Sequence, residues 1–85
     1  MTIRLEDLPN IGAYLAGLLR DIGIATPEAL HAAGAVEAYA RLKFQFPRGV
    51  TLNALWAMDA ALSNSDWRHL SPERKQALKA ALEER

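Results

Sequence analysis

The stretch Leu8-Pro9-Asn10-Ile11-Gly12, together with the apolar residues that follow it as far as Ile24, organises the fold of this chain. Pro9 ends any preceding turn and Asn10 is a typical N-cap residue, so a helix is predicted to begin here. The next apolar residues recur with helical spacing on one face: Ile11, Leu15, Leu18, Leu19 and Ile22. Gly23 supplies the left-handed residue that commonly ends a helix, and Ile24 is expected to fold back against it.

Similar start signals predict further helices along the chain. Thr26-Pro27-Glu28 and Ser71-Pro72-Glu73 each place a capping hydroxyl before a proline and an acid, which suits the first turn of a helix. Thr51 is expected to cap another helix. The helix that begins after Thr26 is predicted to stop at Gly34, and a short helical turn with Thr2 as its N-cap is expected before Leu8.

Ala35 to Phe44 are predicted to form a helix between these signals, with Pro47 closing it and Gly49 giving a turn. One side of that helix carries Val36, Tyr39, Ala40 and the stem of Lys43. The helix after Thr51 places five residues on one face: Leu52, Leu55, Trp56, Asp59 and Leu62. The final helix presents Ala77, Leu78, Ala81 and Leu82.

Length and composition place the chain in one class. Its 85 residues suffice for one domain, residues 1–85, with one hydrophobic core. The β-branched residues are few and scattered, so the fold is predicted to be all-α, a compact bundle of about five short helices.

Charge and residue usage exclude several function classes. Ten basic and ten acidic residues cancel, so the chain lacks the overall basic field typical of nucleic-acid-binding proteins. There is no cysteine, and the two histidines, His31 and His69, lack a third ligand at metal spacing. We therefore expect no metal, no cofactor and no catalytic residue. No apolar run is long enough to cross a membrane, and the first residues do not form a signal peptide, so we expect a cytoplasmic protein without membrane contact.

Two sets of residues carry a family resemblance. Leu8-Pro9-Asn10-Ile11-Gly12, followed by Leu15, Leu19, Gly23-Ile24, Thr26 and Leu30, resembles a helix-hairpin-helix element. The residues after it resemble the C-terminal domain of the TfoX/Sxy family of bacterial competence regulators: Gly34-Ala35-Val36-Glu37-Ala38-Tyr39, Arg41-Leu42-Lys43, Pro47, Leu52-Asn53, Leu55-Trp56-Ala57-Met58, Trp67 and Leu70-Ser71-Pro72. The resemblance covers nearly the whole chain.

This resemblance implies a helical bundle related to helix-hairpin-helix and SAM-like folds, in proteins that regulate DNA uptake and transformation. It implies no catalytic residue. In longer members the domain follows an N-terminal TfoX domain, so the expected protein partner is either such a domain on a separate chain or a second copy of this one. We interpret the chain as a non-enzymatic regulatory domain that acts mainly through protein contacts.

The alternative is a module that binds the DNA backbone without reading sequence. Helix-hairpin-helix elements hold a phosphate on backbone N–H groups at the start of a helix, and nearby cations add charge. The candidate contacts are Asn10, Ile11, Gly12, Ala13, Arg20, Arg41, Lys43 and Arg48. However, Asn10 stands where DNA-binding versions usually have glycine, and no basic residue follows Gly12, so only weak DNA binding is expected.

A few aromatic and charged residues remain to be placed. Trp56 is expected in the core, while Tyr14, Tyr39 and Trp67 are the candidate partner contacts. Of these, Tyr14 and Tyr39 are expected to be exposed. Asp59 lies on an apolar face, where an unpaired carboxylate is costly to bury. We expect it to pair with Arg41 or Arg48 or to accept backbone N–H groups. The cations of the last helix are matched by glutamates and are expected to form a solvated face.

Overall fold

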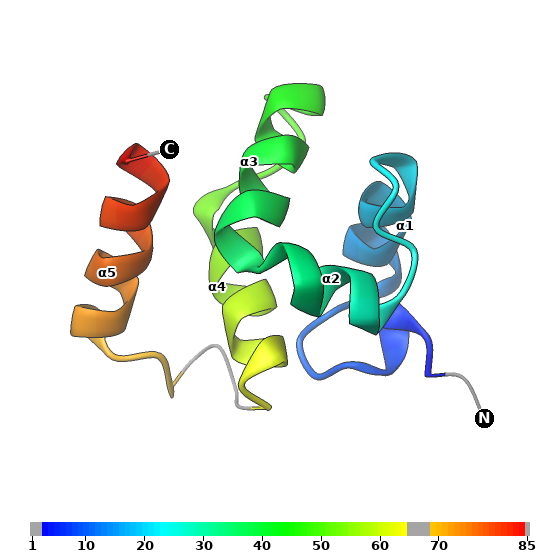
Figure 1. The fold of residues 1–85 in the computed structure, drawn as a ribbon, viewed down its shortest axis with the longest axis horizontal. Helices are drawn as coiled ribbons and strands as arrows, with labels where there is room; N and C mark the ends of the chain where they lie inside the picture. The colour runs from blue at the N-terminus through cyan, green and yellow to red at the C-terminus, as the bar shows by residue number, and fades with distance from the viewer. Residues whose placement is uncertain (1–2, 65–68, 85) are drawn as a thin grey trace.

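The computed structural model describes residues 3–64 and 69–84, and their regular structure is entirely helical (Figure 1). A short 3-10 helix, η1, spans Leu5–Asp7. Five α-helices follow: α1 (Ala13–Asp21), α2 (Pro27–Ala33), α3 (Ala35–Gln45), α4 (Leu52–Leu62) and α5 (Pro72–Glu83). The prediction of an all-α bundle of about five short helices is confirmed.

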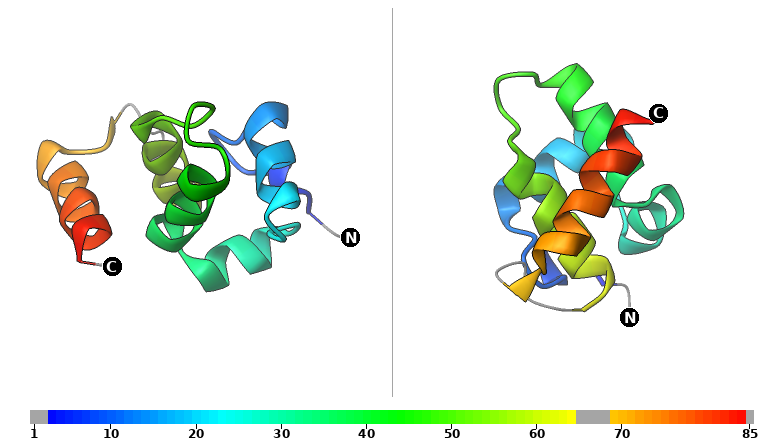
Figure 2. Two further views of the ribbon diagram at one scale, coloured as in Figure 1. Left: turned by 90° about the horizontal axis from the view of Figure 1, so that it is seen from above. Right: turned by 90° about the vertical axis from the view of Figure 1, so that its left-hand side faces the viewer.

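Helix α3 is the centre of the bundle, because it contacts α1, α2, α4 and α5. In two perpendicular views, α1 and α5 lie on opposite sides of the α3–α4 pair (Figures 1 and 2). The largest fully buried side chains come from nearly every element and form one core: Leu5, Leu19, Leu30, Leu42, Leu55 and Met58.

The start of α1 differs from the prediction. Asn10 is not the N-cap of this helix; it adopts a left-handed backbone with φ of 71°, and Gly12 takes the N-cap position. Asparagine tolerates this conformation better than most residues. The chain therefore turns at Asn10, buries Ile11 and enters the helix only at Ala13.

The end of α1 and the start of α2 match the prediction closely. Gly23 has φ of 88°, its N–H donates to the Arg20 carbonyl at 3.1 Å, and the Ile24 N–H donates to the Leu19 carbonyl at 2.9 Å. This pair of bonds is the Schellman motif, and it places Ile24 in the core. At the start of α2, Thr26 Oγ1 accepts a hydrogen bond from the Ala29 N–H at 3.0 Å.

The predicted caps at Ser71 and Thr51 are also confirmed. Ser71 Oγ accepts from the Arg74 N–H at 3.1 Å, and Thr51 Oγ1 accepts from the Asn53 N–H at 3.3 Å. Gly34, with φ of 82°, separates α2 from α3. Helix α3 ends at Gln45, just before Pro47.

Two local predictions need correction. The described N-terminal turn is only the three residues of η1, with Arg4 at its N-cap, while Thr2 lies outside the described residues. The buried face of α3 consists of Ala35, Ala38, Tyr39 and Leu42 and does not include Lys43. Lys43 is exposed, and its ammonium donates to the carbonyls of the loop after α3, at Pro47 (2.9 Å) and Val50 (2.8 Å). Leu42 takes the core position instead.

Candidate functional site

The turn before α1 was the candidate phosphate site, and its backbone is only partly available. Ile11 is buried, and its N–H donates to the Leu8 carbonyl at 3.3 Å. Gly12 and Ala13 are exposed, and no described side chain caps the first turn of α1. Gly12 and Ala13 are therefore the two residues of this turn whose N–H groups could donate to a phosphate.

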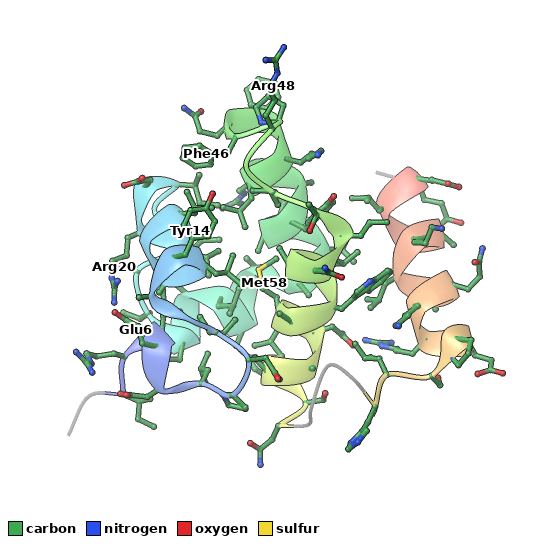
Figure 3. All side chains as sticks on the ribbon, turned by 180° about the vertical axis from the view of Figure 1, so that it is seen from behind. Glu6, Tyr14, Arg20, Phe46, Arg48 and Met58 are labelled. Carbon is green, nitrogen blue, oxygen red and sulfur yellow. The ribbon has the colours of Figure 1, made fainter. Side chains whose placement is uncertain are left out.

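The cations expected to support that turn are not gathered around it. Arg20 Nη2 donates to Glu6 Oε1, which joins α1 to η1. This hydrogen bond raises the pKa of Arg20 and lowers that of the Glu6 carboxyl. Arg41 Nε donates to Glu37 Oε2 at 2.7 Å within α3, and Lys43 is held by the two loop carbonyls. Arg48 is exposed and projects from the loop after α3, at the other end of the molecule from Glu6 (Figure 3).

Tyr14 has an exposed ring, but its hydroxyl group is bonded within the domain. Its side chain is 68% exposed, as predicted, but its hydroxyl donates to the Gly49 carbonyl at 3.1 Å. This bond ties the loop between α3 and α4 to α1, and Phe46 lies in the same region (Figure 3). Tyr14 therefore has a structural role in addition to its exposed ring.

The other two candidate partner contacts do not join Tyr14 at a common surface. The prediction that Tyr39 is exposed is wrong: it is 5% exposed, because it lies on the α3 face that packs into the core. Burial raises the pKa of its phenol. Trp67 lies outside the described residues.

Asp59 is buried and pairs with a cation, but the partner is neither Arg41 nor Arg48. Arg74 of α5 forms two hydrogen bonds with the carboxylate, Nη2 to Oδ1 at 2.6 Å and Nε to Oδ2 at 3.0 Å. The pair raises the pKa of Arg74. Next to it, Lys75 Nζ lies 5.8 Å from the ring centre of Trp56, which is buried as predicted. Arg74 and Lys75 thus attach α5 to α4 and are not simply a solvated face.

A groove that the sequence does not predict lies between the last turns of α1 and α3. It has a volume of about 470 Å³ and is lined by Asp21, Ile22, Ala40, Arg41, Phe44 and Gln45. Phe44 is 88% exposed. The sequence places Phe44 one helical turn after Ala40, but it does not show that Asp21 and Ile22 of α1 lie beside them.

The described part of the chain shows neither a metal cluster nor a membrane-crossing helix. Among residues 3–64 and 69–84, no three His, Cys, Asp or Glu side chains are grouped to hold an ion. His31 and His69 are both exposed, one on α2 and the other just before α5. No helix in these ranges is long and apolar enough to span a bilayer.

Comparison with known proteins relates this bundle to a longer protein. The DNA transformation protein TfoX1 of Aliivibrio fischeri (strain ATCC 700601 / ES114) is 29% identical over 75 residues, which are 88% of this chain and 36% of that protein. The chain thus spans about a third of the length of this curated relative.

Two crystal structures share the fold. An uncharacterized protein from Listeria monocytogenes, in a triclinic form, superposes with a TM-score of 0.86 at 32% identity, over 96% of this chain and 92% of that one. A protein of unknown function from the same organism, in a tetragonal form, gives a TM-score of 0.84 at 32% identity, over 94% and 98% of the two chains.

The family assignment rests on the whole bundle. The profile of the TfoX C-terminal domain matches residues 1–82, from before η1 to the last turn of α5. The match includes the turn at Asn10, the central helix α3 and the Asp59–Arg74 pair. This chain belongs to the TfoX C-terminal domain family.

Proposed function

We propose that this chain is a non-catalytic regulatory domain that works in DNA transformation through contacts with protein. Its family membership and a relative that is named a DNA transformation protein support the process. One structural observation supports the mode of action: three of the four candidate DNA-binding cations are engaged within the molecule, whereas the apolar ring of Phe44 is exposed beside a groove.

The energetics of DNA binding favour this reading. Affinity for the DNA backbone comes from neutralising phosphates with Lys and Arg, and non-specific binding typically has a dissociation constant of ~10⁻⁴ to 10⁻⁶ M at physiological salt. Arg20 and Arg41 are each bonded to a glutamate. These carboxylates cancel much of the positive charge that would attract the DNA backbone, and the net charge of zero provides no long-range attraction.

The alternative, a module that binds the DNA backbone, is supported by one observation. The first turn of α1 is uncapped by any described side chain, and Gly12 and Ala13 are exposed there. Arg20 and Arg48 lie on separate parts of the surface (Figure 3), so this turn would bind phosphate almost by its backbone alone.

A salt titration separates the two functions. Fluorescence anisotropy of a labelled duplex is measured with the protein, with the Arg41→Glu/Lys43→Glu variant, and with Lys79→Glu as a control from the exposed side of α5. We expect no binding tighter than about 10⁻⁴ M at physiological salt. Micromolar binding that weakens steeply with salt, is lost in the double variant and persists in the control would overturn the protein-binding proposal.

The process is tested genetically. Deleting the gene in its host is expected to lower the frequency of transformation, and the wild-type chain is expected to restore it. An unchanged frequency in the deletion strain would remove the role in DNA transformation, independently of the result with DNA.

A further inference from the structure

The groove between α1 and α3 is lined in part by a highly exposed aromatic side chain. Single exposed apolar residues are ordinary on protein surfaces. Phe44, however, is 88% exposed and forms part of the lining of a groove of about 470 Å³ that also contains Ile22 and Ala40. Aromatic side chains beside a pocket are typical anchors of protein interfaces.

The same groove carries one charge of each sign. Asp21 comes from the last turn of α1, and its carboxylate makes no hydrogen bond or ion pair with any residue in the described ranges. Arg41 comes from α3; its Nε is bonded to Glu37, and half of its side chain is exposed. The groove therefore presents an acid, a base and an apolar anchor together.

We propose that the partner at this groove is a second copy of the chain, in a weak two-fold dimer. The inference rests on the proposed protein-binding function and names its partner. In a two-fold interface, residue i meets residue j of the other copy and residue j meets residue i, so the surface must complement itself. Phe44 of each copy then enters the groove of the other, and Asp21 of each copy faces Arg41 of the other.

The dimensions of the domain indicate a weak association. A standard interface buries about 800 Å² per partner, which would be roughly 15% of the 5301 Å² accessible surface of the described residues. The six residues of the groove supply only part of such an area. We expect a dissociation constant of about 10⁻⁵ to 10⁻³ M, and the zero net charge adds no long-range repulsion between copies.

Sedimentation equilibrium over a series of concentrations tests the anchor. The wild-type chain should change from monomer to dimer as its concentration rises to about 1 mM. Phe44→Ser should raise the dissociation constant by about tenfold or more. The control is Leu52→Ser, which removes an exposed apolar side chain of α4 outside the groove lining and should leave the equilibrium unchanged.

A charge exchange tests the pairing in the two-fold dimer. Asp21→Arg places two arginines opposite each other across the axis, and Arg41→Asp does the same with two aspartates. Each variant alone should be monomeric. A mixture of the two should form a heterodimer, because both cross-axis pairs are then of opposite sign. Circular dichroism and thermal unfolding of each variant verify that the fold is retained.

Three results would overturn the dimer: a strict monomer at every concentration, self-association that Phe44→Ser leaves unchanged, or charge variants that stay monomeric when mixed. None of these would by itself refute the protein-binding function, whose failure appears as salt-sensitive DNA binding in the titration above. A wild-type chain that neither dimerises nor binds DNA, but still restores transformation, would overturn the dimer and leave the protein-binding function with a different partner.

Discussion

Gly17 in α1 and Gly23 just after that helix have opposite backbone requirements, although both lie in the stretch that defines the fold. Gly17 is in the middle of the helix, and a Cβ built there meets no atom within 4 Å. Gly23 follows the helix with φ of 88°, a conformation that L side chains rarely adopt. The space around Gly23 is also open, so its requirement comes from the backbone and not from packing.

Alanine substitutions should therefore have opposite effects at these positions. Gly17→Ala should raise the free energy of unfolding by about 0.5–1 kcal/mol, because alanine loses less backbone entropy in a helix. Gly23→Ala should lower it by about 1–2 kcal/mol, because the left-handed conformation strains a residue with a Cβ. Urea unfolding of the two variants and the wild type measures both changes. Equal effects of the same sign would contradict the assigned role of Gly23.

The bond between Glu6 and Arg20 predicts a pH dependence. The hydrogen bond from Arg20 holds the pKa of the folded Glu6 carboxyl below its ordinary value. A lowered folded pKa means that the stabilisation is fully present above the unfolded pKa and is lost as pH falls through the folded pKa. Glu6→Gln should therefore be less stable than the wild type near neutral pH, with a gap that closes in acid.

Denaturant midpoints measured from pH 7 downwards test this, with Glu83→Gln as a control for the loss of one exposed carboxylate. A Glu6→Gln gap that stays constant over the whole pH range would show that the bond to Arg20 makes no pH-dependent contribution to stability.

At the scale of elements, helix α5 is held on the bundle by few contacts. Leu78 is its only buried side chain among the described residues, and Arg74 and Lys75 attach it to Asp59 and Trp56 of α4. Arg74 is more than half exposed, while Asp59 is nearly buried. The energetic importance of the pair therefore lies in satisfying the buried carboxylate.

Arg74→Ala should lower the free energy of unfolding by about 1–3 kcal/mol, because a buried acceptor loses both hydrogen bonds. Arg74→Lys should have a smaller effect, since lysine keeps the positive charge but cannot form the bidentate hydrogen bonds with the carboxylate. Lys79→Ala removes a cation from an exposed position of the same helix and should change stability by less than about 0.5 kcal/mol. Urea unfolding compares the three variants. Equal losses in Arg74→Ala and Lys79→Ala would contradict a specific role of the pair.

The features that could be predicted from the sequence are those decided within a few residues. Thr26 and Ser71 cap helices through N–H groups three positions away, and Gly23 is selected by its own backbone angle. The features that could not be predicted depend on other elements. Asp59 meets a cation 15 residues later, and Tyr39 is buried because neighbouring helices cover its face.

In the candidate site, too, local features could be predicted from the sequence, whereas contacts between different helices could not. The sequence marks Asn10 as a special backbone position but does not decide its role, because helix caps and left-handed turns both favour asparagine. The groove could not be predicted, since it forms where Asp21 and Phe44 of different helices come together. The sequence shows where the basic residues lie along the chain, but it does not show which carboxylates and carbonyls they bind in the folded domain.

At the scale of the whole molecule, the single hydrophobic core is centred on helix α3. Leu42 of α3 is completely buried, and α3 contacts every other α-helix. Leu52 begins α4 and is 36% exposed. The two side chains are identical, but truncating Leu42 would leave a cavity in the core, whereas truncating Leu52 would leave a position that solvent can reach.

Leu42→Ala should cost about 3–5 kcal/mol, because it removes buried methyl groups and leaves a cavity. For a domain whose total stability is expected to be about 5–15 kcal/mol, this is a large fraction. Leu52→Ala should cost less than about 1 kcal/mol. Thermal and urea unfolding test the difference, and similar losses in both variants would argue against a single core centred on α3.

The placement of α1 and α5 on opposite sides of the α3–α4 pair implies an order of local opening. Helix α5 can detach by breaking its contacts with α3 and α4, while the packing of α1 on α3 stays intact (Figure 2). Amide protons of α5 should therefore exchange with solvent through a partial opening, whereas those of α3 require global unfolding. In native-state hydrogen exchange, Arg74→Ala should then accelerate the amides of α5 more than those of α1.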